Sequence, residues 1–301
     1  MRSLSAALLP AVTVILVPSV IAAQTSVCQR GDVGLSYRCP AVSCVDVFRE
    51  PGRYDGYYWV KSTKIAKEAI QVYCTRRPHN CGGEGVWMRV GSIYTGNRNV
   101  ICPGDLLTWV YNRRTYCRSP DQAGCASVVF PTHGAHYTEV CGMLRGYQYY
   151  STDALQRGHI NTADENYVDG ASFTYGANPR KHLWTYAAGA SANLGTSSGA
   201  HCPCSTPRAG TAPPAFVGDR YYCGTAVRHG YTTRVLYASS PLWDGRGICA
   251  GSCCNNPNMP WFRVVLNGST TEHVEMRLCT DSGFDNEAMA VDHMELYIRV
   301  G

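Results

Sequence analysis

The sequence has few charged residues, no long run of one charge sign and no internal repeat. Only 16% of its 301 residues are charged, and 45% are hydrophobic. This composition is typical of a folded globular protein and excludes an intrinsically disordered one. The net charge of +5 is a mild excess spread along the chain, so nucleic acid and anionic membrane surfaces are not expected as the main partners.

Hydrophobic runs long enough to span a bilayer are also missing after residue 23. Residues 1–23 have the pattern of a secretory signal peptide, with Arg2 at the start, an apolar run, and small residues at the end. A membrane anchor is the alternative, but Pro10 and Pro18 interrupt the run. We therefore predict a secreted, extracellular protein with no membrane insertion after signal removal.

All 16 cysteines follow this segment. An even number of cysteines in an oxidising compartment predicts up to eight disulfides. Cys202 and Cys204, and the cluster at 249–254, are alternatively zinc ligands by their short spacing. No paired C-x-x-C knuckles accompany them, so disulfides are the favoured interpretation.

No complete catalytic motif is present. Residues 195–199 match the G-x-S-x-G pattern of hydrolases, but the residues before them are not strand-forming. His133, His136 and Glu139 do not have the H-E-x-x-H spacing of a metalloprotease. We therefore predict a non-enzymatic protein without catalytic residues. The alternative is a secreted hydrolase whose site is assembled only in the fold.

Short aromatic and β-branched segments between Gly, Pro and Asn residues predict an α+β fold of predominantly antiparallel strands. A short helix is expected at 44–50, and strands are expected at 57–60, 70–74, 86–93, 273–278 and 294–300, where apolar and polar residues alternate. Residues 187–215 are expected to form a long surface loop. Because strands bracket this loop, the chain is expected to form one globular unit.

Residues 44–94 resemble the opening subdomain of fibrinogen-related domains. The matching segments are Ser43-Cys44, Asp55-Gly56-Tyr57-Tyr58-Trp59, Val72-Tyr73-Cys74 and Gly82-Gly83-Glu84-Gly85-Val86-Trp87. The resemblance implies a disulfide between Cys44 and Cys74. Thr75-Arg76 stands where the family has an acidic residue, and the family's later tryptophan motifs and aspartate-rich calcium loop are missing. Its known ligand pocket is therefore not implied here.

The rest of the chain resembles a secreted fibrinogen-like family of marine invertebrates such as cnidarians and lancelets. The motifs that carry this likeness are Tyr167-Val168-Asp169-Gly170, Pro179-Arg180-Lys181-His182-Leu183-Trp184-Thr185, Cys202-Pro203-Cys204, Pro241-Leu242-Trp243-Asp244-Gly245, Cys253-Cys254, Pro260-Trp261-Phe262 and Glu295-Leu296-Tyr297. The resemblance implies extracellular residence and no established activity. The expected organisation is a signal peptide at 1–23, an extension at 24–43, a fibrinogen-like subdomain at 44–94 and a disulfide-rich, β-rich region at 95–301.

Two acidic segments have the oxygen donors that calcium requires. They provide the candidate calcium ligands Asp164, Asn166 and Asp169, and Asp281, Asp285 and Glu287. Solvated turns at sheet edges are the alternative for both segments. No other cofactor is expected.

Aromatic residues supply the candidate ligand-binding surface. Because alternate side chains of a strand point to the same side, His182, Trp184 and Tyr186 are expected on one face of a predicted strand. If exposed, they form a stacking platform suited to sugars or peptides, and if buried they are core. Loop position adds Trp243, Asp244 and Trp261 as further candidates, with plugs over disulfides as the alternative.

We predict that the protein recognises extracellular glycans, as a lectin does, or extracellular proteins. A purely structural extracellular-matrix protein is the other alternative. Asn267-Gly268-Ser269 is the only N-x-S/T sequence, and glycosylation is predicted at Asn267 in an exposed turn.

Overall fold

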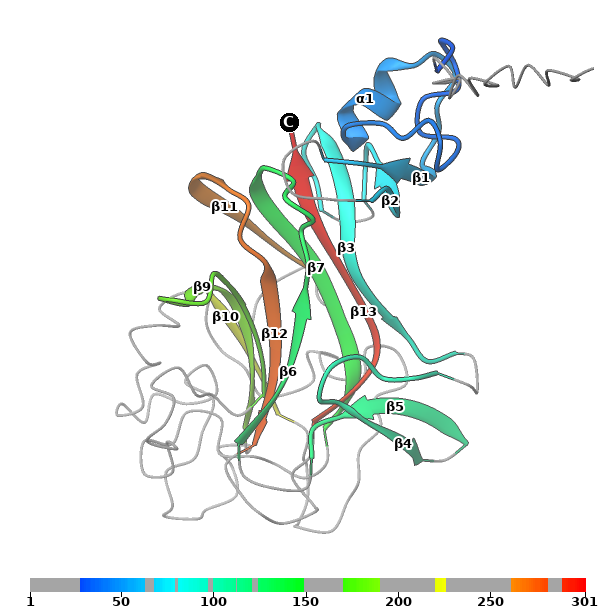
Figure 1. The fold of residues 1–301 in the computed structure, drawn as a ribbon. Helices are drawn as coiled ribbons and strands as arrows, with labels where there is room; N and C mark the ends of the chain where they lie inside the picture. The colour runs from blue at the N-terminus through cyan, green and yellow to red at the C-terminus, as the bar shows by residue number, and fades with distance from the viewer. Residues whose placement is uncertain are drawn as a thin grey trace, which may run out of the picture.

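Two β-sheets facing each other form most of the described part of the chain (Figure 1). The computed structural model describes residues 28–62, 68–78, 81–96, 100–111, 113–120, 124–148, 170–189, 220–225, 261–280 and 289–301. Within these residues the strands form an eight-stranded and a five-stranded sheet. Both are antiparallel except where two strands of the smaller sheet run parallel.

The larger sheet begins next to the single helix of the described residues, α1 (Cys44–Arg49). Its strands are β1 (Gly56–Val60), β2 (Ile70–Thr75), β3 (Val86–Tyr94), β4 (Leu107–Tyr111), β5 (Arg114–Arg118), β7 (Tyr137–Gln148), β11 (Trp261–Thr270) and β13 (Met289–Val300). The long strand β13 is central, because it pairs with β7 along one side and with β3 and β5 along the other. Strands β1, β2 and β3 extend the sheet toward α1 (Figure 1).

The smaller sheet has the order β10-β9-β8-β12-β6. Its strands are β6 (Gly124–Phe130), β8 (Gly170–Tyr175), β9 (Lys181–Gly189), β10 (Tyr221–Thr225) and β12 (Val274–Thr280). Because β6 belongs to this sheet and β7 to the larger one, residues 131–136 connect the two sheets. Residues 271–273 connect β11 to β12 in the same way.

One hydrophobic core fills the space between the sheets. The Trp184 ring of β9 is stacked on the Phe262 ring of β11, with ring centres 4.8 Å apart. Phe173 of β8 lies 4.9 Å from the same Phe262 ring. These contacts join the smaller sheet to the larger one, so burial of both inner faces holds the two layers together.

Five disulfides are formed between cysteines of the described residues. They are Cys28–Cys39, Cys44–Cys74, Cys81–Cys141, Cys102–Cys117 and Cys125–Cys279. The pairing of Cys44 with Cys74 confirms the disulfide that the fibrinogen resemblance implied, and it attaches α1 to β2.

The expected helix and strands are confirmed, and most of their ends differ from the expected ones by no more than two residues. The mostly antiparallel β fold is confirmed as well. In β12 the apolar residues Val274, Met276 and Leu278 are buried as expected, but Arg277 is also only 2% exposed. Both faces of β12 are covered there, so its alternation does not mark one solvent-exposed face. The expected loop at 187–215 overlaps the end of β9, and its remainder lies outside the described residues. No described helix has the length and apolar character needed to cross a membrane.

Candidate functional site

A row of aromatic and basic side chains crosses the larger sheet on the face opposite the core. Tyr57 of β1 pairs directly with Tyr73 of β2, Tyr73 with Arg89 of β3, and Arg89 with Tyr297 of β13. Directly paired residues lie on the same face of a sheet. The neighbouring Tyr58 points the other way and is buried in the core, so this row lies on the outer face.

The first three residues of the row are packed against one another. The Tyr57 and Tyr73 ring centres are 5.3 Å apart in an edge-to-face arrangement. The guanidinium carbon of Arg89 lies 4.8 Å from the Tyr73 ring centre and 5.5 Å from that of Tyr57. Its Nη2 also donates a hydrogen bond to the Tyr57 hydroxyl. Arg89 therefore holds both rings in place from one side.

A second aromatic pair lies on the same side of β1. Trp59 is two residues after Tyr57 and so shares its face. The Tyr37 ring lies edge-on to Trp59 at 5.3 Å and is 51% exposed, and Tyr57 is 59% exposed. We call Tyr37, Tyr57, Trp59, Tyr73 and Arg89 the aromatic face. Exposed aromatic rings gathered in this way are unusual on a protein surface with no binding role.

The chain before β1 is fixed to this strand by backbone hydrogen bonds. The Trp59 N–H donates to the Gly34 carbonyl, and the Ala41 N–H donates to the Trp59 carbonyl. Gly34 has φ of 82°, and a Cβ there would lie 3.1 Å from Val47, so this close approach favours glycine. The extension thereby positions Tyr37 beside Trp59.

The hydroxyl of Tyr73 is kept in its protonated form. Burial raises its pKa, and the negative charge of Asp55 raises it further, against the opposing effect of Arg89. Asp55 itself is engaged, since it accepts hydrogen bonds from the Thr75 hydroxyl at 2.6 Å and the Arg76 backbone at 3.0 Å. The aromatic face therefore offers neutral hydroxyls and one guanidinium rather than free carboxylates.

A hydrogen-bonded chain continues from the aromatic face along β13. The Tyr297 hydroxyl donates to Glu295 at 2.7 Å, and Nε2 of His293 lies 3.1 Å from the other Glu295 oxygen. The hydrogen bond from His293 lowers the pKa of Glu295, whereas burial raises the pKa of Tyr297. The half-exposed Tyr94 ring lies edge-on to His293 at 5.5 Å. Tyr297 is buried at 4% exposure, whereas His293 and Glu295 are partly exposed and Tyr94 is exposed, so the polar surface continues through these last three residues.

A buried carboxylate stabilises the sheet beside this row. Glu139 of β7 is 4% exposed and forms ion pairs with Arg263 of β11, at 2.6 Å, and with Arg299 of β13. Burial by itself raises the pKa of Glu139, but hydrogen bonds from the two arginines outweigh it and lower the pKa. Gly83 has φ of 74°, and a Cβ there would lie 2.8 Å from Arg263. This glycine lets the loop before β3 cover the arginines.

The structure corrects the predicted platform at His182, Trp184 and Tyr186. Trp184 is 6% exposed and Tyr186 is fully buried, so neither ring is available for stacking on a ligand. A bulge at Leu183 also breaks the period of two, because Trp184 pairs with Phe173 and His182 with the next residue, Thr174. His182 instead lies 2.8 Å from the Thr185 hydroxyl, and burial lowers its pKa to about 4. These residues belong to the interior.

The other predicted ligand-binding residues are divided between the core and the undescribed part of the chain. Trp261 is 7% exposed and packs near Tyr297 and the Cys81–Cys141 disulfide, so it is core rather than a loop residue. Trp243 and Asp244 lie outside the described residues.

The calcium predictions remain untested. Asp164, Asn166 and Asp169 lie outside the described residues, and so do Asp281, Asp285 and Glu287. Within the described ranges no group of three or more His, Cys, Asp or Glu side chains is arranged to hold a metal ion.

Asn267 is exposed, but it lies in β11 rather than in a turn. Pairing of β11 with β7 is interrupted between Val265 and Thr270, so Asn267 lies in an irregular part of the strand where its side chain reaches solvent.

The residues of the aromatic face were not among the predicted site residues. Tyr57 and Trp59 alternate with Tyr58 and Val60, which is a recognisable signal for two aromatic residues on the solvent side of a strand. Tyr73 and Arg89 also alternate with apolar neighbours, but only the strand register brings them to Tyr57.

Comparisons with protein-family models, with curated proteins and with solved structures found no match to this chain.

Proposed function

We propose that this protein is a secreted, non-enzymatic recognition protein that binds glycans through its aromatic face. The observation that carries the proposal is the preformed group of Tyr57, Tyr73 and Arg89, in which one guanidinium holds the exposed Tyr57 ring and the partly buried Tyr73 ring. The signal-peptide pattern and the five disulfides support an extracellular setting. The fibrinogen-like character of residues 44–94 is part of the same proposal.

The chemistry of the aromatic face suits a sugar. The apolar face of a pyranose ring can stack on an aromatic ring, while its hydroxyls need hydrogen-bonding groups at the ring's edge. Tyr57 and Tyr37 supply exposed ring surface, Trp59 adds a partly exposed ring, and the Arg89 guanidinium supplies donors beside Tyr57. Because β1, β2 and β3 are hydrogen-bonded to one another, these groups are already ordered before a ligand arrives.

The experiment is a glycan array probed with residues 24–301 produced through a secretory pathway. We expect binding that is lost in Tyr57→Ala and in Arg89→Ala and retained in Tyr54→Ala. Tyr54 is the matched control, because it is 80% exposed and precedes β1. Binding is expected to survive a calcium chelator, since Asp55 is already engaged by Thr75 and Arg76.

Two outcomes contradict the proposal. Glycan binding that is unchanged in both variants excludes the aromatic face as the site. Binding that disappears with the chelator transfers the site to a calcium centre, and makes the acidic segments at 164–169 and 281–287 the next targets. Variants are compared only after their circular dichroism and thermal unfolding match those of the parent protein.

A further inference from the structure

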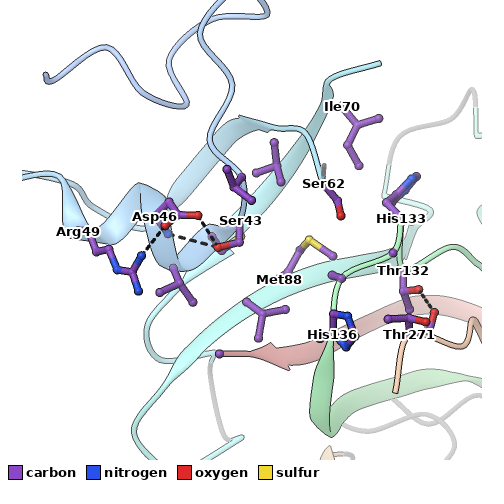
Figure 2. Close-up of a pocket in the computed structure, with 18 residues that line it drawn as sticks. Ser43, Asp46, Arg49, Ser62, Ile70, Met88, Thr132, His133, His136 and Thr271 are labelled. Carbon is purple, nitrogen blue, oxygen red and sulfur yellow. Dashed lines mark hydrogen bonds and ion pairs between the residues drawn. The ribbon is translucent and has the colours of Figure 1, made fainter. Parts of the chain in front are cut away.

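A cavity of about 480 Å³ lies between α1 and the connections that join the two sheets (Figure 2). This volume falls within the range of roughly 300–1,000 Å³ that small-molecule sites have. In Figure 2 the residues of α1 lie on one side of the cavity, and Thr132, His133, His136 and Thr271 on the other. The cavity is separate from the aromatic face, because Met88, the residue of β3 that lines it, is buried on the opposite side of the strand from its neighbour Arg89.

The interior of the cavity is largely apolar. Val60, Ile70, Met88 and Val300 line it from β1, β2, β3 and β13. Burial of a ligand's apolar surface against such a wall is favourable by roughly 25 cal/mol for each Å² removed from water.

Two charged side chains of α1 that line the cavity, Asp46 and Arg49, neutralise each other. Arg49 is paired with Asp46 at 2.7 Å, and the Ser43 hydroxyl donates to the same Asp46 at 3.0 Å. Ser43 caps the N-terminus of α1, Asp46 lies in its first turn, and Arg49 lies in its last turn. The wall on this side therefore presents no net charge to a ligand.

Three polar side chains in the lining have no hydrogen-bond partner within the described structure: Ser62, His133 and His136. Thr132 differs from them, because its hydroxyl donates to the Thr271 carbonyl at 2.6 Å. Burial lowers the pKa of His133, and the nearby His273 lowers it further, so its imidazole is uncharged at neutral pH. A neutral imidazole and a hydroxyl can each donate or accept a hydrogen bond.

The backbone holds His133 in position. Residues 132–135 form a tight turn closed by the Ala135 N–H and the Thr132 carbonyl, in which His133 has φ of 52° and Gly134 has φ of 76°. Histidine and asparagine tolerate this left-handed conformation better than most residues. The turn is held against residues 271–273 by the Thr132 hydrogen bond to the Thr271 carbonyl. Such conformations are often retained at binding sites.

We propose that this cavity binds a small, uncharged and largely apolar molecule whose hydroxyl or carbonyl group is met by Ser62, His133 and His136. The apolar wall takes the body of the ligand. The charges of Asp46 and Arg49 compensate each other, so the α1 side of the cavity favours neither an anionic nor a cationic ligand.

The test uses three probes of one size and different charge: cyclohexanol, cyclohexanecarboxylate and cyclohexylammonium. Each is titrated against the oxidised protein in competition with the neutral fluorophore N-phenyl-1-naphthylamine. We expect cyclohexanol to displace the fluorophore at least about tenfold more effectively than either ion, and to shift the NMR signals of the Met88 methyl group and the His133 ring. Equal displacement by all three probes, or no fluorophore binding at millimolar concentration, overturns the proposal.

Variants separate the polar contribution from the shape of the cavity. His133→Asn keeps a residue that tolerates the turn but removes the imidazole, and Ser62→Ala removes the hydroxyl. Each is expected to weaken cyclohexanol binding about fivefold, the effect of one lost hydrogen bond. Ser92→Ala is the matched serine control, since Ser92 is exposed on β3 away from the cavity. Unchanged affinity in both cavity variants contradicts the contacts assigned to Ser62 and His133. If a variant does not fold, the series of three probes with the wild-type protein still tests the proposal.

Discussion

The guanidinium of Arg89 lies over the ring of Tyr73, 4.8 Å from its centre, on the neighbouring strand. A cation held over a ring at such a half-exposed site contributes roughly 0.5–1 kcal/mol. Arg89→Met removes the charge and keeps much of the stem, so we expect it to lower the free energy of unfolding by about 1 kcal/mol. Urea unfolding followed by tyrosine and tryptophan fluorescence measures this. An Arg89→Met protein as stable as the parent indicates that the contact contributes nothing.

Glu139 is expected to be the most costly charged residue to remove from the larger sheet. Glu139→Gln leaves Arg263 and Arg299 facing each other without a counter-charge. Breaking a fully buried pair costs roughly 3–5 kcal/mol, but both arginines are about one-third exposed, so we expect a loss of about 2 kcal/mol. Because the folded pKa of Glu139 is lowered, its stabilising effect is present above about pH 4.3 and is lost as the pH falls further.

The pH dependence of unfolding distinguishes the loss of the Glu139 charge from a packing defect. The stability difference between parent and Glu139→Gln proteins is expected to shrink between pH 5 and pH 3. A difference that stays constant over that range assigns the loss to packing rather than to the carboxylate charge.

His182 is expected to make the fold sensitive to mild acid. Burial lowers its folded pKa to about 4, whereas an unfolded histidine titrates near 6.5. The unfolded chain therefore takes up a proton first, and stability falls as the pH drops from about 6.5 to about 4, by about 3 kcal/mol from this group. His182→Gln keeps a hydrogen-bonding side chain near Thr185 and removes this dependence. An NMR titration of His182 with a pKa near 6.5 contradicts the prediction.

The disulfide pattern is directly measurable. Digestion of the unreduced protein followed by mass spectrometry is expected to recover linked peptides for Cys81–Cys141 and Cys125–Cys279, among the five pairs. The double variant Cys125→Ala, Cys279→Ala is expected to lose about 2–5 kcal/mol, because this bond joins residues 154 positions apart and so restricts the unfolded chain. A peptide that links Cys125 to any other cysteine contradicts the pairing.

Glycosylation at Asn267 remains a prediction that exposure of the residue favours. Protein from secretory cells is treated with an amidase that converts a glycosylated Asn to Asp, and its mass is measured. We expect a drop in intact mass that Ser269→Ala abolishes. An unchanged mass in the parent protein refutes glycosylation at this position.

Strands of regular alternation were predictable, and the places where pairing departs from regularity were not. The alternation in 294–300 correctly located β13 and its buried residues Leu296 and Ile298. The same reasoning failed at His182, because the bulge at Leu183 depends on the partner strand β8. A period of two shows which residues share a face of a strand, but not which face packs against the second sheet. In the structure the rings of Trp184 and Tyr186 are on the packed side and lie in the core.

The candidate site depends on pairing across strands that are separated in the sequence. Tyr57 and Arg89 meet because the register of β1 with β2 and of β2 with β3 aligns them. Local patterns contain no information on that register. The cavity has the same origin, since α1 and the turn at His133 are brought together only by the packing of β3 and β13.

The central position of β13 determines when the protein can mature. Its partner β3 ends at Tyr94, but β13 begins only at Met289. At a synthesis rate of roughly 5–20 residues per second, the edge of β3 waits on the order of 10–40 s for its partner. Contacts within 28–75, including the Cys28–Cys39 and Cys44–Cys74 bonds, need no such delay. We therefore expect maturation in two stages, and a chaperone that shields the open edge of β3 is expected to raise the yield of the complete two-sheet structure.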